Sequence, residues 1–360
     1  MKKILLYVDE LGSGGAQRQI VALARLLKQK GYPVQMLDYW DNTFYDDELN
    51  QLGIHYHHAN VKGKINIIYD FLKSINKIKP DVVIAYMENP SIIACIGKIF
   101  TRHKFKLIVS ERNTTQKNTP DCKFRFNLFR VADYIVPNSY SQCDFININY
   151  TFLNKKVIPI TNLIDTNYFI PSDKFEEPKR ETNRCLVVGR VVEQKNVLRF
   201  LEAINQIKEN LKHIHIDWYG KPYPEEYYKE CKRLIKEYDL GDLIEFHLPH
   251  NKIVNEYQRS DFFILPSIYE GFPNVLCEAM SCGLPVLAGN ICDNGRIMDN
   301  EQNGFLFNPF DVDDMARTIK RFICLSDEEK KKMGDESRKL ALQKFSEDTF
   351  ISKYIELIES

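Results

Sequence analysis

The sequence predicts an α/β protein made of two doubly wound domains, each with a parallel sheet covered by helices on both faces. Short apolar runs of strand length alternate with helical stretches along the chain, and this order is typical of such sheets. A glycine-rich turn joins the first apolar run to the first helical stretch, as at the start of a doubly wound domain. At 360 residues the chain is long for one hydrophobic core, so two domains of roughly 170 residues each are expected.

The first domain is expected to cover residues 1–169. Its predicted strands are residues 3–8, 34–37, 54–57, 82–86, 106–109 and 134–136. The spacing of apolar residues predicts helices at residues 16–30 and 65–77. Gly14 and Gly15 lie between the first strand and the first helix, where glycines let a ligand approach the helix N-terminus. The turn is not the dinucleotide fingerprint Gly-x-Gly-x-x-Gly, because the third glycine is missing.

The second domain is assigned to residues 170–345 and starts with a polar segment, residues 170–183, of linker composition. The strands predicted after it are residues 184–188, 214–219, 244–248, 262–265 and 285–287, and the helices are residues 197–209, 274–282 and 315–325. A final helix is expected at residues 348–358, inside a C-terminal segment of residues 346–360.

Composition argues against several classes of protein. Basic and acidic residues number 49 each, so no net charge favours binding to nucleic acid. The nine cysteines form no Cys-x-x-Cys pair, which disfavours a disulfide framework or a zinc site and fits a reducing cytoplasm. The first apolar run is too short for a signal peptide, and no stretch approaches the ~20 apolar residues of a membrane span. A cytoplasmic protein, soluble or at most peripheral on a membrane, is expected.

The most informative stretch is residues 265–287, where a strand, a loop, a helix and another strand follow one another. The start of a helix has N–H groups without intrahelical partners and the positive end of the helix dipole, so an anion is expected to bind there. The residues predicted to contact that anion are Phe272, Pro273, Asn274, Val275 and Leu276, and Gly271 is expected to let the ligand come close. Glu270 and Glu278 flank the site as hydroxyl acceptors, which suits a sugar joined to a diphosphate and a ribose.

A second turn between a strand and a helix carries two cations. Gly189 and Arg190 follow the strand at residues 184–188, and Lys195 precedes the next helix. Cations at such a turn neutralise a diphosphate that the helix start already attracts. The alternative is a pair of ordinary surface charges; the motif at residues 265–287 favours a binding role.

The motif Pro-Ser-x-x-Glu-Gly-Phe-Pro-Asn-Val-x-x-Glu-Ala-Met-Ser-Cys-Gly-x-Pro-Val at residues 266–286 resembles that of the retaining GT-B glycosyltransferases of family four, the group 1 glycosyltransferases. The resemblance implies two Rossmann-like domains facing across a cleft. The first would bind the acceptor, the second would bind the nucleotide sugar, and the last helix would return to the first domain.

The resemblance also implies a reaction. A hexosyl or N-acetylhexosaminyl group would pass, with retention, from a nucleotide-diphosphate sugar to a hydroxyl of a glycan or a lipid-diphosphate-linked acceptor. A UDP-sugar is the favoured donor, no metal or other cofactor is expected, and the product would be a cell-surface polysaccharide such as a capsule, an exopolysaccharide or an O-antigen. A GT-B nucleotide-sugar epimerase and a catalytically silent nucleotide-sugar-binding protein remain as alternatives.

Site residues are carried over from the family one by one. Arg190, Lys195 and Glu270 are expected to be catalytic, the first two on the diphosphate and the third on sugar hydroxyls. Glu278 is expected to bind the ribose, and Gly189 and the residues from Gly271 to Leu276 to contact the donor. Gly14 and Gly15 would face the donor diphosphate and the acceptor.

The chain departs from the family pattern at several positions. Gln17 replaces a usual glutamate, Leu163 replaces a usual glycine, and Pro249 lies where a glycine is common in the loop near the base. Glu111, Arg112 and Asn113 stand where many members have a histidine in the first domain. The role of these three residues is left unassigned.

Residues 100–130 form a segment with eight basic and two acidic residues, interleaved with phenylalanines. Such a segment can lie on an anionic membrane or bind a diphosphate-linked acceptor. The alternative is a solvated helix and loop, because the sequence does not show whether these side chains share a face.

Two other groups were weighed as metal sites. His55, His57 and His58 alternate across a predicted strand without a clear set of further ligands, so they are interpreted as a solvated strand end. Asp311, Asp313 and Asp314 precede a predicted helix and are interpreted as helix caps. No metal site is therefore predicted.

Overall fold

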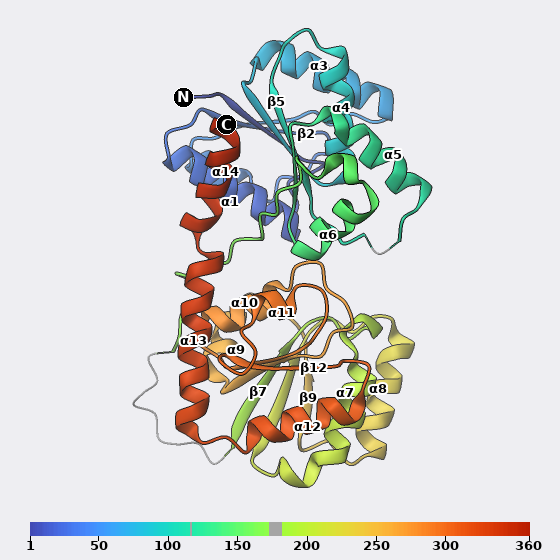
Figure 1. Ribbon diagram of the computed structural model, residues 1–360, viewed down its shortest axis with the longest axis vertical. Helices are drawn as coiled ribbons and strands as arrows, with labels where there is room; N and C mark the ends of the chain where they lie inside the picture. Colours follow the sequence, from blue (N-terminus) through green and yellow to red (C-terminus); the bar gives the residue numbers. More distant parts are fainter. Residues whose placement is uncertain (116, 173–181) are drawn as a thin grey trace. The chain divides into compact units, whose positions relative to one another are not determined.

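The computed structural model describes residues 1–115, 117–172 and 182–360 (Figure 1). It contains two compact units, one formed by Met1–Leu163 with Glu347–Ser360 and the other by Ile164–Ser346. The sequence placed this division at residue 169. Ile164 and Phe169 instead pack in the core of the second unit, which is why the chain changes unit earlier. Most of the predicted linker, residues 173–181, lies outside the described residues.

The first unit contains a six-stranded parallel sheet in the order β3-β2-β1-β4-β5-β6. Its strands are β1 (Ile4–Tyr7), β2 (Val34–Asp38), β3 (His55–His58), β4 (Val82–Tyr86), β5 (Lys106–Glu111) and β6 (Tyr134–Pro137). Its helices are α1 (Gly15–Gln29), α2 (Asp46–Gln51), α3 (Lys64–Ile78), α4 (Glu88–Phe100), α5 (Pro120–Leu128), α6 (Tyr140–Asn149) and α14 (Glu347–Glu359), with short 3-10 turns η1 (Phe129–Val131) and η2 (Thr151–Leu153). Apolar side chains of α1, α2 and α14 cover one face of the sheet, and those of α3 to α6 cover the other.

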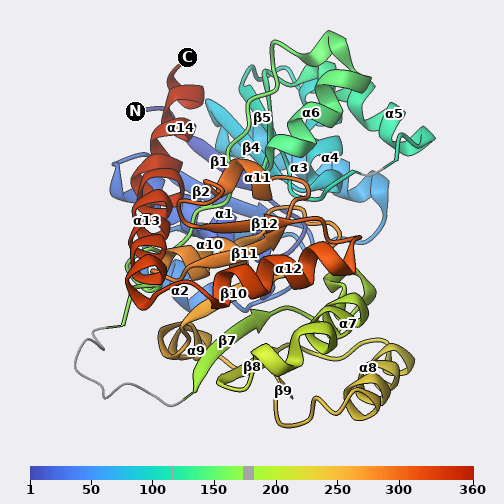
Figure 2. The same ribbon diagram turned by 60° about the horizontal axis from the view of Figure 1, so that its bottom comes forward.

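The second unit contains another six-stranded parallel sheet, in the order β12-β11-β10-β7-β8-β9. Its strands are β7 (Asn183–Val188), β8 (Ile214–Tyr219), β9 (Ile244–His247), β10 (Phe262–Leu265), β11 (Val286–Gly289) and β12 (Gly304–Phe307). Its helices are α7 (Val197–Ile207), α8 (Glu225–Glu237), α9 (Ile253–Arg259), α10 (Asn274–Ser281), α11 (Asn294–Ile297), α12 (Val312–Ile323) and α13 (Asp327–Phe345), with 3-10 turns η3 (Glu193–Lys195) and η4 (Lys208–Asn210). Helices α7, α8 and α12 share one core with the sheet, and α9, α10 and α11 share the core on its other face (Figure 2).

The two sheets have the same topology when their strands are numbered within each unit, namely 3-2-1-4-5-6. This is the doubly wound order of nucleotide-binding α/β domains. In each sheet the first and fourth strands lie side by side while the chain leaves them in opposite directions, so ligands are expected beyond their carboxyl ends. The relevant edges lie after β1 and β4 in the first unit, and after β7 and β10 in the second.

The final helix α14 belongs to the first unit because its apolar side packs on the first sheet. Tyr354 is fully buried there, and its hydroxyl lies 2.8 Å from the hydroxyl of Tyr86 on β4. Arg25 of α1 forms an ion pair with Glu347 at the start of α14. No helix within the described residues is both long and apolar enough to cross a membrane.

Candidate functional site

The candidate site lies at the carboxyl ends of β7 and β10, adjacent strands of the second sheet. Gly189 and Arg190 follow β7, and Lys195 ends the 3-10 turn that precedes α7. Ser267 and Glu270 belong to the loop between β10 and α10. Parallel pairing brings both loops to the same edge of the sheet, so residues distant in sequence meet there.

Lys195 and Glu270 form the centre of this edge. The Lys195 Nζ donates to Glu270 Oε1 at 2.5 Å, and both side chains are about nine-tenths buried, with exposures of 12% and 10%. Ser267 Oγ donates to the same oxygen at 2.6 Å. A charge pair withdrawn from water with an added hydrogen bond is held in a fixed geometry, and removing one partner leaves the other charge uncompensated.

The loops that carry these charges are also joined through their backbones. The N–H of Ile268 donates to the carbonyl oxygen of Gln194 at 3.0 Å. The Gln194 side chain donates to the carbonyl oxygen of Tyr269 at 2.9 Å. The pair of Lys195 and Glu270 is therefore supported by contacts on each side of it.

Gly189 is required by the path of the lysine side chain. A Cβ added at residue 189 would lie 2.8 Å from Lys195 Cε, and one added at Gly220 would lie 1.9 Å from the Gly189 carbonyl oxygen. Trp218 Nε1 donates to that oxygen at 2.7 Å. Since real Cβ contacts are not this short, a larger residue at position 189 would displace Lys195.

Asn196 also shapes the site, although no sequence pattern indicates a separate role for it. It adopts a left-handed conformation with φ of 60°, which asparagine tolerates better than most residues. Its buried side chain donates to the carbonyl oxygens of Pro266 at 3.1 Å and Pro309 at 2.7 Å. Asn196 thereby links the Lys195 turn to the start of the Glu270 loop.

The start of α10 is more enclosed than the predicted anion site suggested. The N–H of Asn274 donates to the carbonyl oxygen of Phe272 at 2.9 Å, and the N–H of Leu276 donates to that of Pro273 at 3.0 Å. Phe272 and Leu276 are buried in the core. These two N–H groups thus have partners within the turn, whereas Gly271, Asn274 and Val275 are partly exposed. Anion binding at this turn remains a prediction.

Glu278 lies on the buried side of α10, where Tyr257 of α9 is its neighbour. The Tyr257 hydroxyl donates to Glu278 Oε2 at 3.0 Å. Burial, followed by the charge of Glu278, raises the pKa of Tyr257 well above its ordinary value, so the phenol stays protonated and remains a donor. No pattern in the sequence indicates Tyr257, because it lies on a separate helix.

Arg190 differs from Lys195 in being exposed. It forms no ion pair with any other residue that the structure describes. The two cations predicted to act together therefore have different surroundings: Lys195 is buried against Glu270, and Arg190 is exposed.

In the first unit, α1 begins at Gly15, one residue before its predicted start, and Gly14 directly precedes it. A Cβ added to Gly15 would meet no atom within 4 Å, whereas one added to Gly14 would lie 2.1 Å from Gln17 Oε1. The buried Gln17 donates to Asp9 Oδ1 at 3.4 Å, and burial is the main reason why the pKa of Asp9 is raised. Contact of these glycines with a donor remains a prediction.

Glu111 and Arg112, both left unassigned, are buried. Glu111 Oε2 lies 3.2 Å from the Arg125 guanidinium, which also lies 2.5 Å from Glu88 Oε1. Burial raises the pKa of Glu111 to about 7 even though Arg125 lowers it. Arg112 donates to the Tyr354 hydroxyl at 2.9 Å and lies over the Tyr86 ring. Arg112 therefore secures α14 rather than facing a ligand.

Asn113 is the exposed member of the three. It lines a cavity of about 480 Å³, together with Glu88, Thr115, Lys117 and Arg125. The cavity lies beyond the carboxyl end of β5. A polar cavity at this edge offers amide, hydroxyl and charged groups to a polar ligand.

The basic and aromatic segment at residues 100–130 does not form one continuous face. Arg112 is buried and hydrogen-bonded, and Arg125 is buried and ion-paired. Lys106 donates to carbonyl oxygens at the end of α14, and three phenylalanines belong to the core. The exposed remainder consists of Phe100, Arg102, Lys104, Lys117, Lys123, Phe124 and Arg130. The predicted surface is thus limited to these seven residues.

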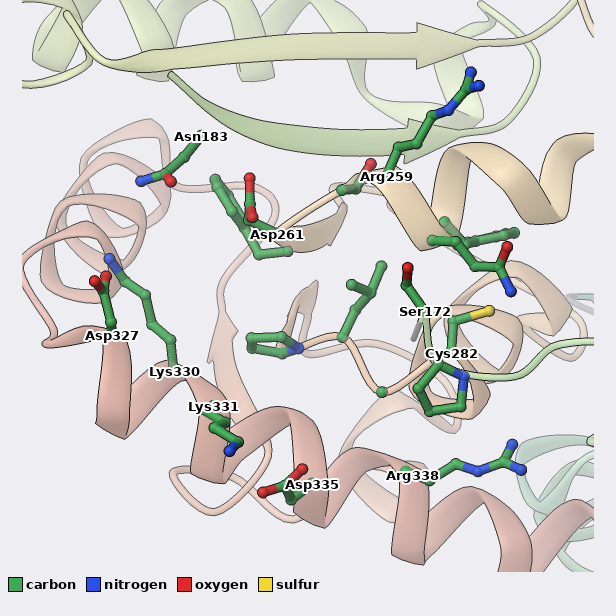
Figure 3. A pocket seen from close by; sticks show the side chains of 18 of the residues that line it. Ser172, Asn183, Arg259, Asp261, Cys282, Asp327, Lys330, Lys331, Asp335 and Arg338 are labelled. Atoms are coloured by element: carbon green, nitrogen blue, oxygen red, sulfur yellow. The ribbon is translucent and has the colours of Figure 1, made fainter. Parts of the chain in front are cut away.

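A cavity of about 530 Å³ (Figure 3) has a lining that includes neither Lys195 nor Glu270. Its lining includes Asp261 and Pro285, which directly precede β10 and β11. It is therefore at the amino ends of the strands, opposite the edge that carries Lys195. Arg338 at its border donates hydrogen bonds to the carbonyl oxygens of Thr166 and Ser281. This cavity is not assigned to the reaction.

The structure shows the contacts of the aspartates at residues 311–314 and of the histidines at residues 55–58. Asp311 caps α12, its side chain accepting from the N–H of Asp314, so the cap interpretation is confirmed. His58 was expected at a solvated strand end; instead Asp38 lies 2.7 Å from its Nδ1 and Asp46 lies 3.1 Å from its Nε2. Asp38 and Asp46 lie 20 and 12 residues from His58 in the sequence, so only the fold shows that they are its neighbours.

Comparison with known proteins adds independent evidence. Residues 169–340 match the family model described as Glycosyl transferases group 1. A Campylobacter jejuni N-acetylgalactosamine-N,N'-diacetylbacillosaminyl-diphospho-undecaprenol 4-alpha-N-acetylgalactosaminyltransferase is 25% identical over 90% of this chain and 90% of its own. The Staphylococcus aureus capsular polysaccharide biosynthesis glycosyltransferase CapH is 25% identical over 82% of this chain and 84% of its own.

Solved structures share the fold. A glycosyltransferase from Rickettsia africae has a TM-score of 0.87 and 20% identity, covering 99% of this chain and 98% of its own. Anabaena HepE, solved in complex with UDP, has a TM-score of 0.86 and 18% identity, covering 99% of each chain. The predicted α/β class and GT-B architecture are confirmed. Residues 169–340 thus match the group 1 glycosyltransferases, the relatives that span most of the chain are named glycosyltransferases, and the two parallel sheets have the GT-B fold.

Proposed function

We propose that the protein is a retaining glycosyltransferase that moves a hexosyl or N-acetylhexosaminyl group from a UDP-sugar to a hydroxyl of a lipid-diphosphate-linked glycan. The observation that carries this proposal is the buried contact between Lys195 and Glu270 at the carboxyl ends of β7 and β10. A cation and a carboxylate held at this edge suit a ligand that has a diphosphate beside sugar hydroxyls.

The chemistry follows from where charge develops. The bond between the anomeric carbon and the diphosphate oxygen breaks, and a bond from that carbon to the acceptor oxygen forms on the same face. The acceptor proton passes to a diphosphate oxygen. Lys195 and Arg190 stabilise the negative charge that accumulates on the leaving group, while Glu270 accepts hydrogen bonds from sugar hydroxyls.

Glu278 already accepts a hydrogen bond from the Tyr257 hydroxyl. We propose that its carboxylate also accepts hydrogen bonds from the ribose hydroxyls of the donor. We further propose that transfer needs no metal ion, because Lys195 and Arg190 occupy the role that a divalent cation otherwise fills on a diphosphate. Charged groups of the protein then supply the whole electrostatic stabilisation of the leaving group.

The acceptor class is supported by the relatives. The Campylobacter jejuni relative is named for a diphospho-undecaprenol substrate and CapH for capsular polysaccharide biosynthesis. Such a lipid-linked acceptor sits at a membrane. The exposed cations and phenylalanines between Phe100 and Arg130 are proposed to bring the enzyme to the inner face of the cell membrane.

The test is to incubate the purified protein with a panel of UDP-, GDP-, TDP- and ADP-sugars. Thermal shift identifies the bound donor, and slow release of nucleotide diphosphate identifies hydrolysis in the absence of acceptor. We expect one UDP-sugar to give both signals, with or without a chelator. Release that stops in chelator and returns with Mg²⁺ or Mn²⁺ would reject metal independence, and no shift with any nucleotide sugar would reject the donor class.

A further inference from the structure

Four chemically related side chains gather on one face of the second sheet, outside the proposed transfer site. His215 and Asp217 are two residues apart on β8, and Glu245 and His247 are two residues apart on β9. Asp217 pairs with Glu245 in the register of the two parallel strands. Alternate residues of a strand point to the same face, so all four side chains are on one side of the sheet.

The ligand atoms of this group are close together. His215, Asp217 and Glu245 each offer one ligand atom, and these three atoms all lie within 4.8 Å of one another. The separation from His215 Nε2 to Asp217 Oδ1 is 3.6 Å, and His247 Nε2 lies 2.8 Å from Asp217 Oδ1 and 3.8 Å from Glu245 Oε2. In a tetrahedral zinc site with bonds of ~2.0–2.2 Å, ligand atoms are about 3.3–3.6 Å apart.

The hydrogen bond of His215 indicates which of its nitrogens is available. Its Nδ1 lies 3.3 Å from the carbonyl oxygen of Asp242. A carbonyl oxygen only accepts, so Nδ1 carries a proton, and a cation bound by this ring would be held by Nε2. Nε2 lies 3.6 Å from Asp217 Oδ1, beyond hydrogen-bond distance. A ring nitrogen and a carboxylate oxygen at this separation are suited to sharing a cation.

The partners around the group match the surroundings of a metal site. Histidines that bind metals commonly donate their other N–H to a backbone carbonyl, which orients the ring; His215 has this bond. Arg184 donates twice to Asp217 Oδ2, at 2.9 and 2.7 Å, and this leaves Oδ1 on the side of the two histidines. By contrast, both ring nitrogens of His58 are occupied by carboxylates.

We propose that His215, Asp217, Glu245 and His247 form a zinc-class metal site that joins β8 to β9. The ligands are two imidazoles and two carboxylates, a set that suits Zn²⁺. Binding needs His247 to give up its hydrogen bond to Asp217 and place a ring nitrogen on the ion. The site is structural and separate from the transfer reaction, which is proposed to be independent of metal.

The test is calorimetric titration of the full chain, without an affinity tag, with ZnCl₂. Cys292 and Cys324, the exposed cysteines, are first replaced by serine so that thiols do not bind the metal. We expect one saturable Zn²⁺ site per chain, and a visible Co²⁺ spectrum of tetrahedral type that Zn²⁺ removes. His215→Ala and Glu245→Gln should each weaken binding by at least the roughly 10–100-fold seen when the outer partners of a metal site are changed.

His213→Ala is the matched control, since His213 is exposed, lies two residues from His215 and is outside the group. It should bind Zn²⁺ as the parent does. Both ligand positions are partly or well exposed, and circular dichroism establishes that each variant is folded. Absence of saturable binding by the parent, or equal binding by His215→Ala and His213→Ala, would overturn the proposal. Neither result bears on donor binding, which is read from nucleotide release.

Discussion

The two units have the same strand order, but the carboxylate after the fourth strand is paired with a cation from a different element in each. Glu88 follows β4 and Glu270 follows β10, each the fourth strand of its sheet, and each carboxylate lies 2.5 Å from a cation. In the second unit the cation is Lys195, from the loop after the first strand. In the first unit it is Arg125, from α5, and Arg125 also contacts the buried Glu111.

This difference shows how one fold provides either a binding edge or an internal brace. The Lys195 pair lies where two glycine-containing loops meet at the sheet edge, and its members are suited to a diphosphate and a sugar. The Arg125 group connects α4, β5 and α5 to one another. The shared fold does not by itself decide function. The two charged groups differ because Lys195 comes from a loop at the sheet edge and Arg125 comes from a helix.

The largest expected effect on stability comes from breaking the group in the first unit. Arg125→Ala leaves Glu111 buried without its main partner, so the free energy of unfolding should fall by about 3–5 kcal/mol. Arg130→Ala is the control, because Arg130 is exposed and only lies over the Phe152 ring; it should cost less than about 1 kcal/mol. Equal losses in urea denaturation would show that Arg125 is not a brace.

In the second unit, Glu278→Gln should act on binding more than on the chemical step. The ribose contact is made equally in the ground and transition states, so the donor KM should rise while kcat changes little. Losing one charged hydrogen bond is worth roughly 1.5–3 kcal/mol. Steady-state kinetics with a saturating acceptor measures both constants. A fall in kcat at unchanged KM would contradict the ribose assignment.

The exposed part of the first unit is expected to give a smaller effect, on membrane affinity. Replacing Lys117 and Lys123 by alanine should weaken sedimentation with anionic vesicles by about 1 kcal/mol per lysine. Binding should also fall with salt, as the Debye length shrinks from ~10 Å at 0.1 M to ~3 Å at 1 M. Replacing the exposed Lys212 and Lys229 of the second unit is the control. Equal binding to neutral and anionic vesicles at low salt would show that these lysines do not bind the membrane through their charge.

A fourth effect is a change in the pH dependence of stability. Burial raises the pKa of Glu111 from 4.5 to about 7, so between these values the folded protein holds a proton that the unfolded chain has lost. Stability should therefore decrease as pH rises through this window. Glu111→Gln removes the titrating group, and its free energy of unfolding should decrease less between about pH 5 and pH 7.5. Parallel curves for variant and parent would show that the pKa is not raised.

Much of the fold follows from local sequence patterns. The apolar runs at β4 and β10 were predicted with their observed bounds, because a buried parallel strand needs apolar side chains on both faces. β12 was missed: it is only four residues long and begins with Gly304, where a Cβ would lie 1.7 Å from the Val286 carbonyl oxygen. α13 was also missed, since charged residues dominate it.

The site was predictable in its residues but not in its contacts. The glycines and charges near β7 and β10 carry the family motif, yet Lys195 and Glu270 are 75 residues apart and meet only because their strands pair. Asn196 and Tyr257 support the site from a turn and a separate helix, which local patterns do not link to it. The sequence shows that Glu111 and Arg112 depart from the family pattern, but only the packing of the fold shows that both side chains are buried.

If Lys195 stabilises the departing diphosphate, its removal should show in kcat, measured for Lys195→Ala with the identified UDP-sugar. Loss of one preorganised group of this kind costs about 10²–10³ in kcat. We predict a fall of that size, partial rescue by Lys195→Arg, and no change for the exposed Lys212→Ala, with circular dichroism confirming each fold. A Lys195→Ala enzyme that saturates with donor and keeps the parent's kcat would contradict the account.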